Sequence, residues 1–331
     1  YFQDNRGARG HYSDGRADRN FIKTMEDIRS HLIGQEFQVN RVYVSQSANP
    51  LKFRDGTPVP QEVKESLVFD EKAVTKLLVR YINEGQLIVG YRGHGEPEGW
   101  EKPALKNDDL LSITSDQPSI FFSINCLSGC FHKINQKAFA EKLLELHGGA
   151  PAIIASTETS WRWRNDSLIK ALFDAIWPGL IPTYPITNVN YAIKYQRVGD
   201  ILNYAKTYLL LKHGCDIDRR TKDHLELYHV IGDPTLAIWA NEPYIPEMST
   251  GILGNSLYLK MSTCPRDAVL TIWHGDTLLK RIKPSSARLT IPLTSLMKHI
   301  NHGDTKRSKR FYVSICLSAP GCRMVEEQVW F

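Results

Sequence analysis

The spacing of apolar residues divides the chain into two parts with different secondary structure. Up to residue 240, segments with helical spacing alternate with short apolar runs ending in glycine or asparagine, which are typical of buried parallel strands. This alternation predicts a mostly parallel sheet with helices on both faces. The helices are expected at 19–32, 71–83, 137–147, 167–177 and 187–213, the strands at 39–45, 86–91, 119–124 and 152–157, and long loops at 46–69 and 96–118.

After Asn241-Glu242-Pro243 the pattern changes to short strands separated by turn signals. This spacing predicts a small β-sandwich over residues 241–331, after an α/β domain over residues 4–240. Tyr1-Phe2-Gln3 matches the end of a common purification tag and is therefore set aside. The strands of the second part are expected at 256–261, 269–274, 287–292, 311–317 and 324–331.

Composition and charge exclude two classes of protein. No apolar run approaches the ~18 residues of a membrane-spanning helix. Residues 241–331 hold 12 of the 41 lysines and arginines and 7 of the 36 acidic residues, so the remaining 29 of each cancel and the net charge of +5 belongs to this part. Its basic run at 306–310 lies between a turn and a strand and has no accompanying nucleic-acid motif, so we expect a solvated loop and no nucleic-acid partner.

Six cysteines are too few and too scattered for a disulfide scaffold. Cys264, Cys316 and Cys322 lie in the second part, where one disulfide and one free thiol are expected.

His94 and Cys126 each follow a predicted strand, within Gly93-His94-Gly95 and Asn125-Cys126-Leu127-Ser128-Gly129. Groups just past the carboxyl ends of parallel strands converge on one edge of a sheet. An imidazole beside a thiol is the minimal pair for nucleophilic catalysis, because it helps the thiol to ionise. Two other interpretations remain open: a buried cysteine beside an ordinary His-Gly turn, or a zinc cluster of Cys126, Cys130 and His132, which lacks a second ligand pair.

Four segments in the order expected of one enzyme family extend over residues 89–236. Together they resemble the sequence boxes of the gingipain-like cysteine peptidases, peptidase family C25 of the caspase-like clan. The resemblance implies a caspase-like α/β sandwich with a mostly parallel sheet, followed by a small immunoglobulin-like β-sandwich. The segments are Val89-Gly90-Tyr91-Arg92-Gly93-His94-Gly95 with Trp100, Cys126-x-x-Gly129-x-Phe131 with Ala138-Phe139-Ala140-Glu141, Ala152-Ile153-Ile154-Ala155-Ser156-Thr157 with Trp161, and His229-Val230-Ile231-Gly232-Asp233-Pro234-Thr235-Leu236.

The resemblance also implies roles for individual residues. Cys126 would attack the peptide carbonyl to form a thioester, and His94 would act as general base and acid. Backbone N–H groups of Gly95 and Cys126 would bind the oxyanion. In this family an upstream acidic residue orients the imidazole, and Asp14 matches best, ahead of Asp18, although Asp14-Gly15 also reads as an ordinary turn.

Substrate selection is predicted from the segment after the third box. In lysine-cleaving members an acidic residue shortly after an aromatic pocket residue binds the basic side chain, so Asp166 and then Glu158 are the candidates for cleavage after Lys or Arg. Trp161 and Trp163 would form the wall of the pocket. In the alternative interpretation, Asp166 only caps the helix that follows it.

The predicted function is therefore hydrolysis of polypeptides by a secreted or bacterial cell-surface cysteine endopeptidase. No cofactor is required, a structural calcium ion is allowed, and a monomer is expected. The alternatives are a sortase-like transpeptidase of a secretion system, in which an amine intercepts the thioester, and a catalytically idle binding module.

Overall fold

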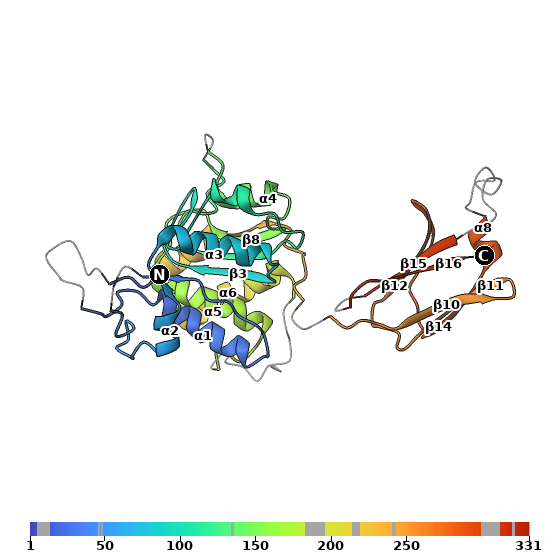
Figure 1. The fold of residues 1–331 in the computed structure, drawn as a ribbon, viewed down its shortest axis with the longest axis horizontal. Helices are drawn as coiled ribbons and strands as arrows, with labels where there is room; N and C mark the ends of the chain where they lie inside the picture. Colours follow the sequence, from blue (N-terminus) through green and yellow to red (C-terminus); the bar gives the residue numbers. More distant parts are fainter. Residues whose placement is uncertain are drawn as a thin grey trace. The chain divides into compact units, whose positions relative to one another are not determined.

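The structure is a computed structural model that describes residues 1–4, 14–45, 47, 49–133, 136–182, 196–213, 219–239, 243–298, 312–319 and 322–330 (Figure 1). The chain divides into two compact units, Tyr1–Ala240 and Asn241–Phe331. None of the helices within these described ranges is long and apolar enough to cross a membrane.

A four-stranded sheet forms the centre of the first unit, in the order β3-β7-β8-β9. β3 (Ile88–Arg92), β7 (Ile120–Ile124) and β8 (Ala152–Ser156) are parallel, and β9 (Tyr228–Gly232) pairs antiparallel with β8. β7 and β8 are buried along their whole length, which agrees with their unbroken apolar sequences. The sheet is therefore mostly parallel and covered on both faces, as the alternating pattern predicted.

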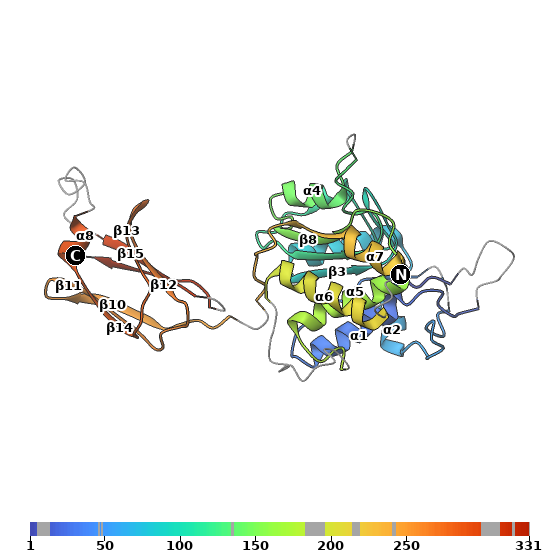
Figure 2. The ribbon, with the colours of Figure 1, turned by 180° about the vertical axis from the view of Figure 1, so that it is seen from behind.

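Successive residues of the central strands pack into two separate cores. Phe122 and Ile154 face the core formed with α1 (Phe21–Ile33), α5 (Arg162–Ile176) and α6 (Val198–His213). Phe121 and Ile153 face the core formed with α3 (Glu71–Asn83) and α4 (Phe139–Glu145). Figures 1 and 2 show α1, α5 and α6 on one side of the sheet and α4 on the other. The remaining short elements of this unit are α2 (Gln61–Glu65), α7 (Arg219–Leu227), β1 (Tyr43–Val44), β2 (Leu67–Val68), β4 (Gly95–Glu96), β5 (Gly99–Glu101), β6 (Ala104–Lys106) and a 3₁₀ helix, Asp109–Ser112.

Local sequence signals explain some boundaries and not others. α3 begins where predicted, because the carboxylate of Asp70 accepts the N–H groups of Lys72 and Ala73. The predicted strand at 39–45 is paired over β1 and, through an isolated bridge to Phe2, at Ser45. The predicted loops at 46–69 and 96–118 contain short helices and strands. α5 begins five residues earlier than predicted, and α7 was not predicted at all. Residues 187–195 of the predicted long helix lie outside the described residues, and its described part begins at Val198.

Setting Tyr1-Phe2-Gln3 aside was wrong, because these residues are an integral part of the first unit. The side chain of Phe2 is 1% exposed and packs in a cluster with Ile22 and Tyr43. The N–H of Phe2 donates to the Val44 carbonyl at 2.8 Å, which extends the β1 edge by one short bridge.

The second unit consists of two antiparallel sheets. One has the order β10-β11-β14 and the other β13-β12-β15-β16, and side chains from both sheets share one apolar core. Cys264, Cys316 and Cys322 are free thiols, so the disulfide expected among them is absent from this part of the described chain. The basic run at 306–310 lies outside the described residues. The elements are β10 (Met248–Leu253), β11 (Ser256–Met261), β12 (Val269–His274), β13 (Thr277–Ile282), β14 (Arg288–Pro292), α8 (Leu293–Met297), β15 (Tyr312–Ser318) and β16 (Val325–Trp330).

Candidate active site

The register of the sheet brings the His94 and Cys126 segments together. Arg92 at the end of β3 pairs with Ile124 at the end of β7, and His94 and Cys126 each follow two residues later. A Cβ atom on Gly95 would lie 2.5 Å from Asn125 Oδ1 and 2.8 Å from the Cys126 carbonyl oxygen. Only glycine fits here, so the two segments pack in direct contact.

The two cysteines of the nucleophile segment have different environments. Cys126 is half-buried, whereas Cys130 has no exposed surface and packs as an apolar residue. Burial raises the pKa of the Cys130 thiol, which keeps it protonated. Within the described residues, no three histidine, cysteine or acidic side chains are grouped so that they could hold a metal ion. Cys126, Cys130 and His132 therefore do not form the zinc cluster of the alternative interpretation.

The imidazole of His94 contacts an amide where a carboxylate was expected. Its Nε2 lies 3.0 Å from Oε1 of Gln3, and the ring of Phe21 packs edge-on at 5.1 Å between centroids. Burial lowers the pKa of His94 to about 4, and the cations Arg19 and Arg92 add to this effect. The imidazole is therefore neutral, and able to accept a proton, at any pH well above 4.

Asp14, the residue expected to orient His94, lies in the Asp-Gly turn that was its alternative interpretation. Its exposed side chain accepts the N–H of Arg16 at 2.9 Å, and its own N–H points toward the carboxylate of Asp4. Asp18, the second choice, contributes its backbone carbonyl to Arg54 at 2.6 Å. Gln3 was missed because residues 1–3 were set aside, although two aromatic residues before it already suggested a buried segment.

The low pKa of His94 predicts the pH dependence of catalysis by this pair. A base with a pKa of about 4 stays unprotonated as the pH falls through 6.5, so the acidic limb of kcat/KM should have its midpoint near pH 4. Arg19→Gln removes one neighbouring cation and should move this midpoint upward. Initial rates in brief assays between pH 3.5 and 8 provide the measurement. A wild-type midpoint at pH 6.5 or above would contradict the lowered pKa of His94.

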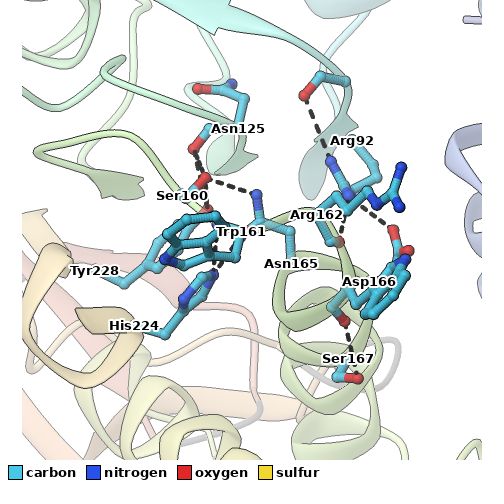
Figure 3. Close-up of polar contacts among 12 residues, drawn as sticks. Arg92, Asn125, Ser160, Trp161, Arg162, Asn165, Asp166, Ser167, His224 and Tyr228 are labelled. Carbon is cyan, nitrogen blue, oxygen red and sulfur yellow. Dashed lines mark hydrogen bonds and ion pairs between the residues drawn. The ribbon is translucent and has the colours of Figure 1, made fainter. Parts of the chain in front are cut away.

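Asp166 forms a buried ion pair with Arg92 (Figure 3). Nε of Arg92 lies 2.7 Å from Asp166 Oδ1, and the two side chains are 2% and 15% exposed. Arg92 also donates to the Arg162 carbonyl at 2.6 Å, and its guanidinium lies 4.7 Å above the ring of Phe21. Asp166 therefore lies inside α5 rather than capping it, and its charge is already compensated within the chain.

Glu158, the second acidic candidate, is an exposed residue that pairs with His132 at 3.0 Å. Trp161 and Trp163, the predicted pocket wall, are about half-exposed at the start of α5. The guanidinium of Arg220 lies over the Trp161 ring and that of Arg162 over the Trp163 ring, each at 4.9 Å. The surface around the start of α5 thus combines aromatic rings with cations.

Four buried polar residues near Cys126 belong to none of the motifs recognised in the sequence. Ser160, Asn165, His224 and Tyr228 form a hydrogen-bonded network around the Asn125 carbonyl, and Figure 3 shows its members arriving from three segments of the chain. A histidine and a tyrosine four residues apart, just before the last box, were the only local sign of it.

The model of peptidase family C25 matches residues 3–239. The chain belongs to this family. The match extends from Gln3 to the end of the first unit and confirms the gingipain-like resemblance of the four sequence segments. No curated protein matches the chain.

Three solved structures share the fold. The Arg-specific cysteine proteinase gingipain R superposes with a TM-score of 0.57 at 15% identity, over 98% of this chain and 63% of its own. The Porphyromonas gingivalis complex of gingipain pro- and mature domains gives 0.57 at 16% identity, over 93% and 63%. A third structure, described as a protease, gives 0.51 at 16% identity, over 80% and 58%. The chain spans less than two thirds of the length of these structures.

Proposed function

We propose that the chain is a cysteine endopeptidase in which Cys126 is the nucleophile and His94 the general base. The observation that carries this proposal is the register of β3 and β7, which puts a half-buried thiol and a neutral imidazole at matching positions past two paired strand ends. Membership of a peptidase family supports the same reaction class.

The reaction follows from the chemistry of these two groups. His94 takes the proton of the Cys126 thiol as sulfur bonds to the carbonyl carbon, and returns it to the amine as the C–N bond breaks. Water then attacks the thioester, its proton passes to His94, and the thiol is regenerated. Gln3 would hold the imidazole through its 3.0 Å contact, and the N–H groups of Gly95 and Cys126 would bind the oxyanion.

Preference for lysine or arginine at the cleavage site is not part of this proposal. The carboxylate of Asp166 is paired with Arg92, and that of Glu158 with His132. A substrate cation would have to displace a buried guanidinium to reach Asp166, and breaking such a pair is costly. The nearby Arg162 and Arg220 also oppose a cationic side chain.

The proposal also covers the domain types, the cofactor requirement, the oligomeric state and the location of the protein. The first unit would be a caspase-like peptidase domain and the second an immunoglobulin-like domain without catalytic groups. The chemistry would need no cofactor, with calcium only in a structural role. We propose a monomer that acts on polypeptides and that is secreted or held at a bacterial cell surface, as the family resemblance implies.

Covalent labelling and product analysis test the function. The protein is treated with peptidyl acyloxymethyl ketones that carry alanine, lysine or aspartate at the reactive end, and the modified peptide is identified by mass spectrometry. We expect label on Cys126, and free acid as the product from unlabelled peptide substrates. A ligated product in the presence of an added amine would instead indicate a transpeptidase. Absence of both label and product would indicate an idle binding module.

A further inference from the structure

One residue, Ser160, contacts the sulfur of Cys126 with three of its groups. The Ser160 N–H donates to Sγ at 3.4 Å, and Ser160 Oγ lies 3.6 Å from Sγ. The thiol also reaches the Ser160 carbonyl at 3.7 Å. The sulfur therefore has both a donor and acceptors from a single residue, which lies two positions before α5.

The hydroxyl of Ser160 is itself held by buried partners. It donates to the Asn125 carbonyl at 2.9 Å and accepts from Nδ2 of Asn165 at 2.7 Å. The hydroxyl of Tyr228 lies 3.0 Å from the same Asn125 carbonyl and 2.8 Å from Asn165 Oδ1. Two hydroxyl groups are thus within hydrogen-bond distance of one carbonyl (Figure 3).

This duplication matters when Cys126 loses its proton. A thiolate needs hydrogen-bond donors, and a buried carbonyl left without a partner costs free energy. If the Ser160 hydroxyl turns from Asn125 to the sulfur, the Tyr228 hydroxyl can keep the carbonyl paired. His224 Nε2, 2.9 Å from Asn165 Oδ1, stands at the far end of the network.

We propose that Ser160 is a positioning residue for the Cys126 nucleophile, and that Asn165, Tyr228 and His224 hold its hydroxyl ready to turn toward the sulfur. The inference rests on the proposed function, since it concerns the same thiol. It assigns a role to four residues that take no direct part in the proposed reaction.

The titratable groups around the thiol are compatible with this role. His94 follows the end of β3 at the position that matches Cys126 after β7, and Arg92 lies close enough to affect His94, His224 and Tyr228. Burial lowers the pKa of His224 to about 4 and raises that of Tyr228. Both side chains are therefore neutral near pH 7, and the single ring proton of His224 can be donated either to Asn165 Oδ1 or to the Arg220 carbonyl, 2.9 Å from Nδ1.

The test is alkylation of Cys126 by iodoacetamide in the full chain, followed from pH 5 to 9 by mass spectrometry of the Cys126 peptide. In Ser160→Ala the pH of half-maximal rate should rise by about one unit, so that the rate below that pH falls about tenfold. Ser160→Thr, which keeps the hydroxyl, should restore the profile. Tyr228→Phe should shift it in the same direction by a smaller amount.

Two matched variants serve as controls. Ser167→Ala removes a buried hydroxyl of α5 that donates to the Trp163 carbonyl, and Tyr43→Phe removes a buried hydroxyl that donates to Glu26. Both should keep the wild-type profile. Wild-type profiles in both Ser160→Ala and Tyr228→Phe would overturn the inference, and if Ser160→Ala fails to fold, Tyr228→Phe decides alone. Failure of the proposed function would appear separately, as wild-type protein that alkylates normally but cleaves no peptide.

Discussion

Cys126→Ala is expected to abolish peptide cleavage, whereas Cys130→Ala should retain most of it. The two thiols are four residues apart, but only Cys126 is reached by solvent and lies beside the His94 segment. Without the thiol no covalent intermediate can form, and loss of a catalytic nucleophile typically lowers kcat by ~10⁶-fold. The measurement is the initial rate with a fluorogenic peptide library at equal concentrations of folded protein.

The thermal unfolding temperature of each variant shows whether a loss of activity comes from loss of the thiol or from loss of the fold. Cys126→Ala should unfold near the wild-type temperature, while Cys130→Ala removes a fully buried side chain and should lose some stability. Equal inactivity of the two variants, with both folded, would contradict the assignment and favour a role shared between the two thiols.

Asp166→Asn is expected to destabilise the protein by about 3 kcal/mol without changing substrate preference. The substitution keeps the size of the side chain but leaves the guanidinium of Arg92, 2% exposed, without its counter-charge. A buried charge that has lost its partner is the source of the cost. The midpoint of urea unfolding gives the stability, and the ratio of kcat/KM for lysine and alanine substrates gives the preference.

A matched change on the same side of the sheet provides the control. Asp27 also pairs with cations, Lys23 and Lys170, but these side chains are 30% exposed, so Asp27→Asn should cost less than ~1 kcal/mol. The contrary outcome is that Asp166→Asn proves as stable as wild type and selectively loses cleavage after lysine. In that case Asp166 binds the substrate, and Arg92 is not the group that compensates its charge.

Features that depend on neighbouring residues could be predicted from the sequence. β11 and β12 occupy the predicted residues because their alternating apolar positions are a local pattern. His94 and Cys126 could be paired because parallel strands end at one edge of the sheet, whatever the details of packing. β13 was missed because its sequence, Thr-Leu-Leu-Lys-Arg-Ile, lacks clean alternation.

Features that depend on contacts across the fold could not be predicted in this way. The start of α5 was placed too late because Asn165-Asp166-Ser167 resembles a helix cap. In the structure Asn165 bonds to Ser160, and Asp166 to Arg92, 74 residues earlier in the chain. The contact between Gln3 and His94 extends over 91 residues, and no spacing rule connects such distant positions.

These separations also set the order in which the site can form during synthesis. Cys126 is 34 residues from Ser160, and the Asn125 carbonyl is 103 residues from the Tyr228 hydroxyl. Contacts this distant form only after large loops have closed, so they arise late in folding. A growing chain on the ribosome therefore carries the Cys126 thiol before Ser160 and Tyr228 have been synthesised, whereas Gln3, the partner of His94, is already present. The network around the Asn125 carbonyl therefore stays incomplete until nearly all of the first unit has been synthesised.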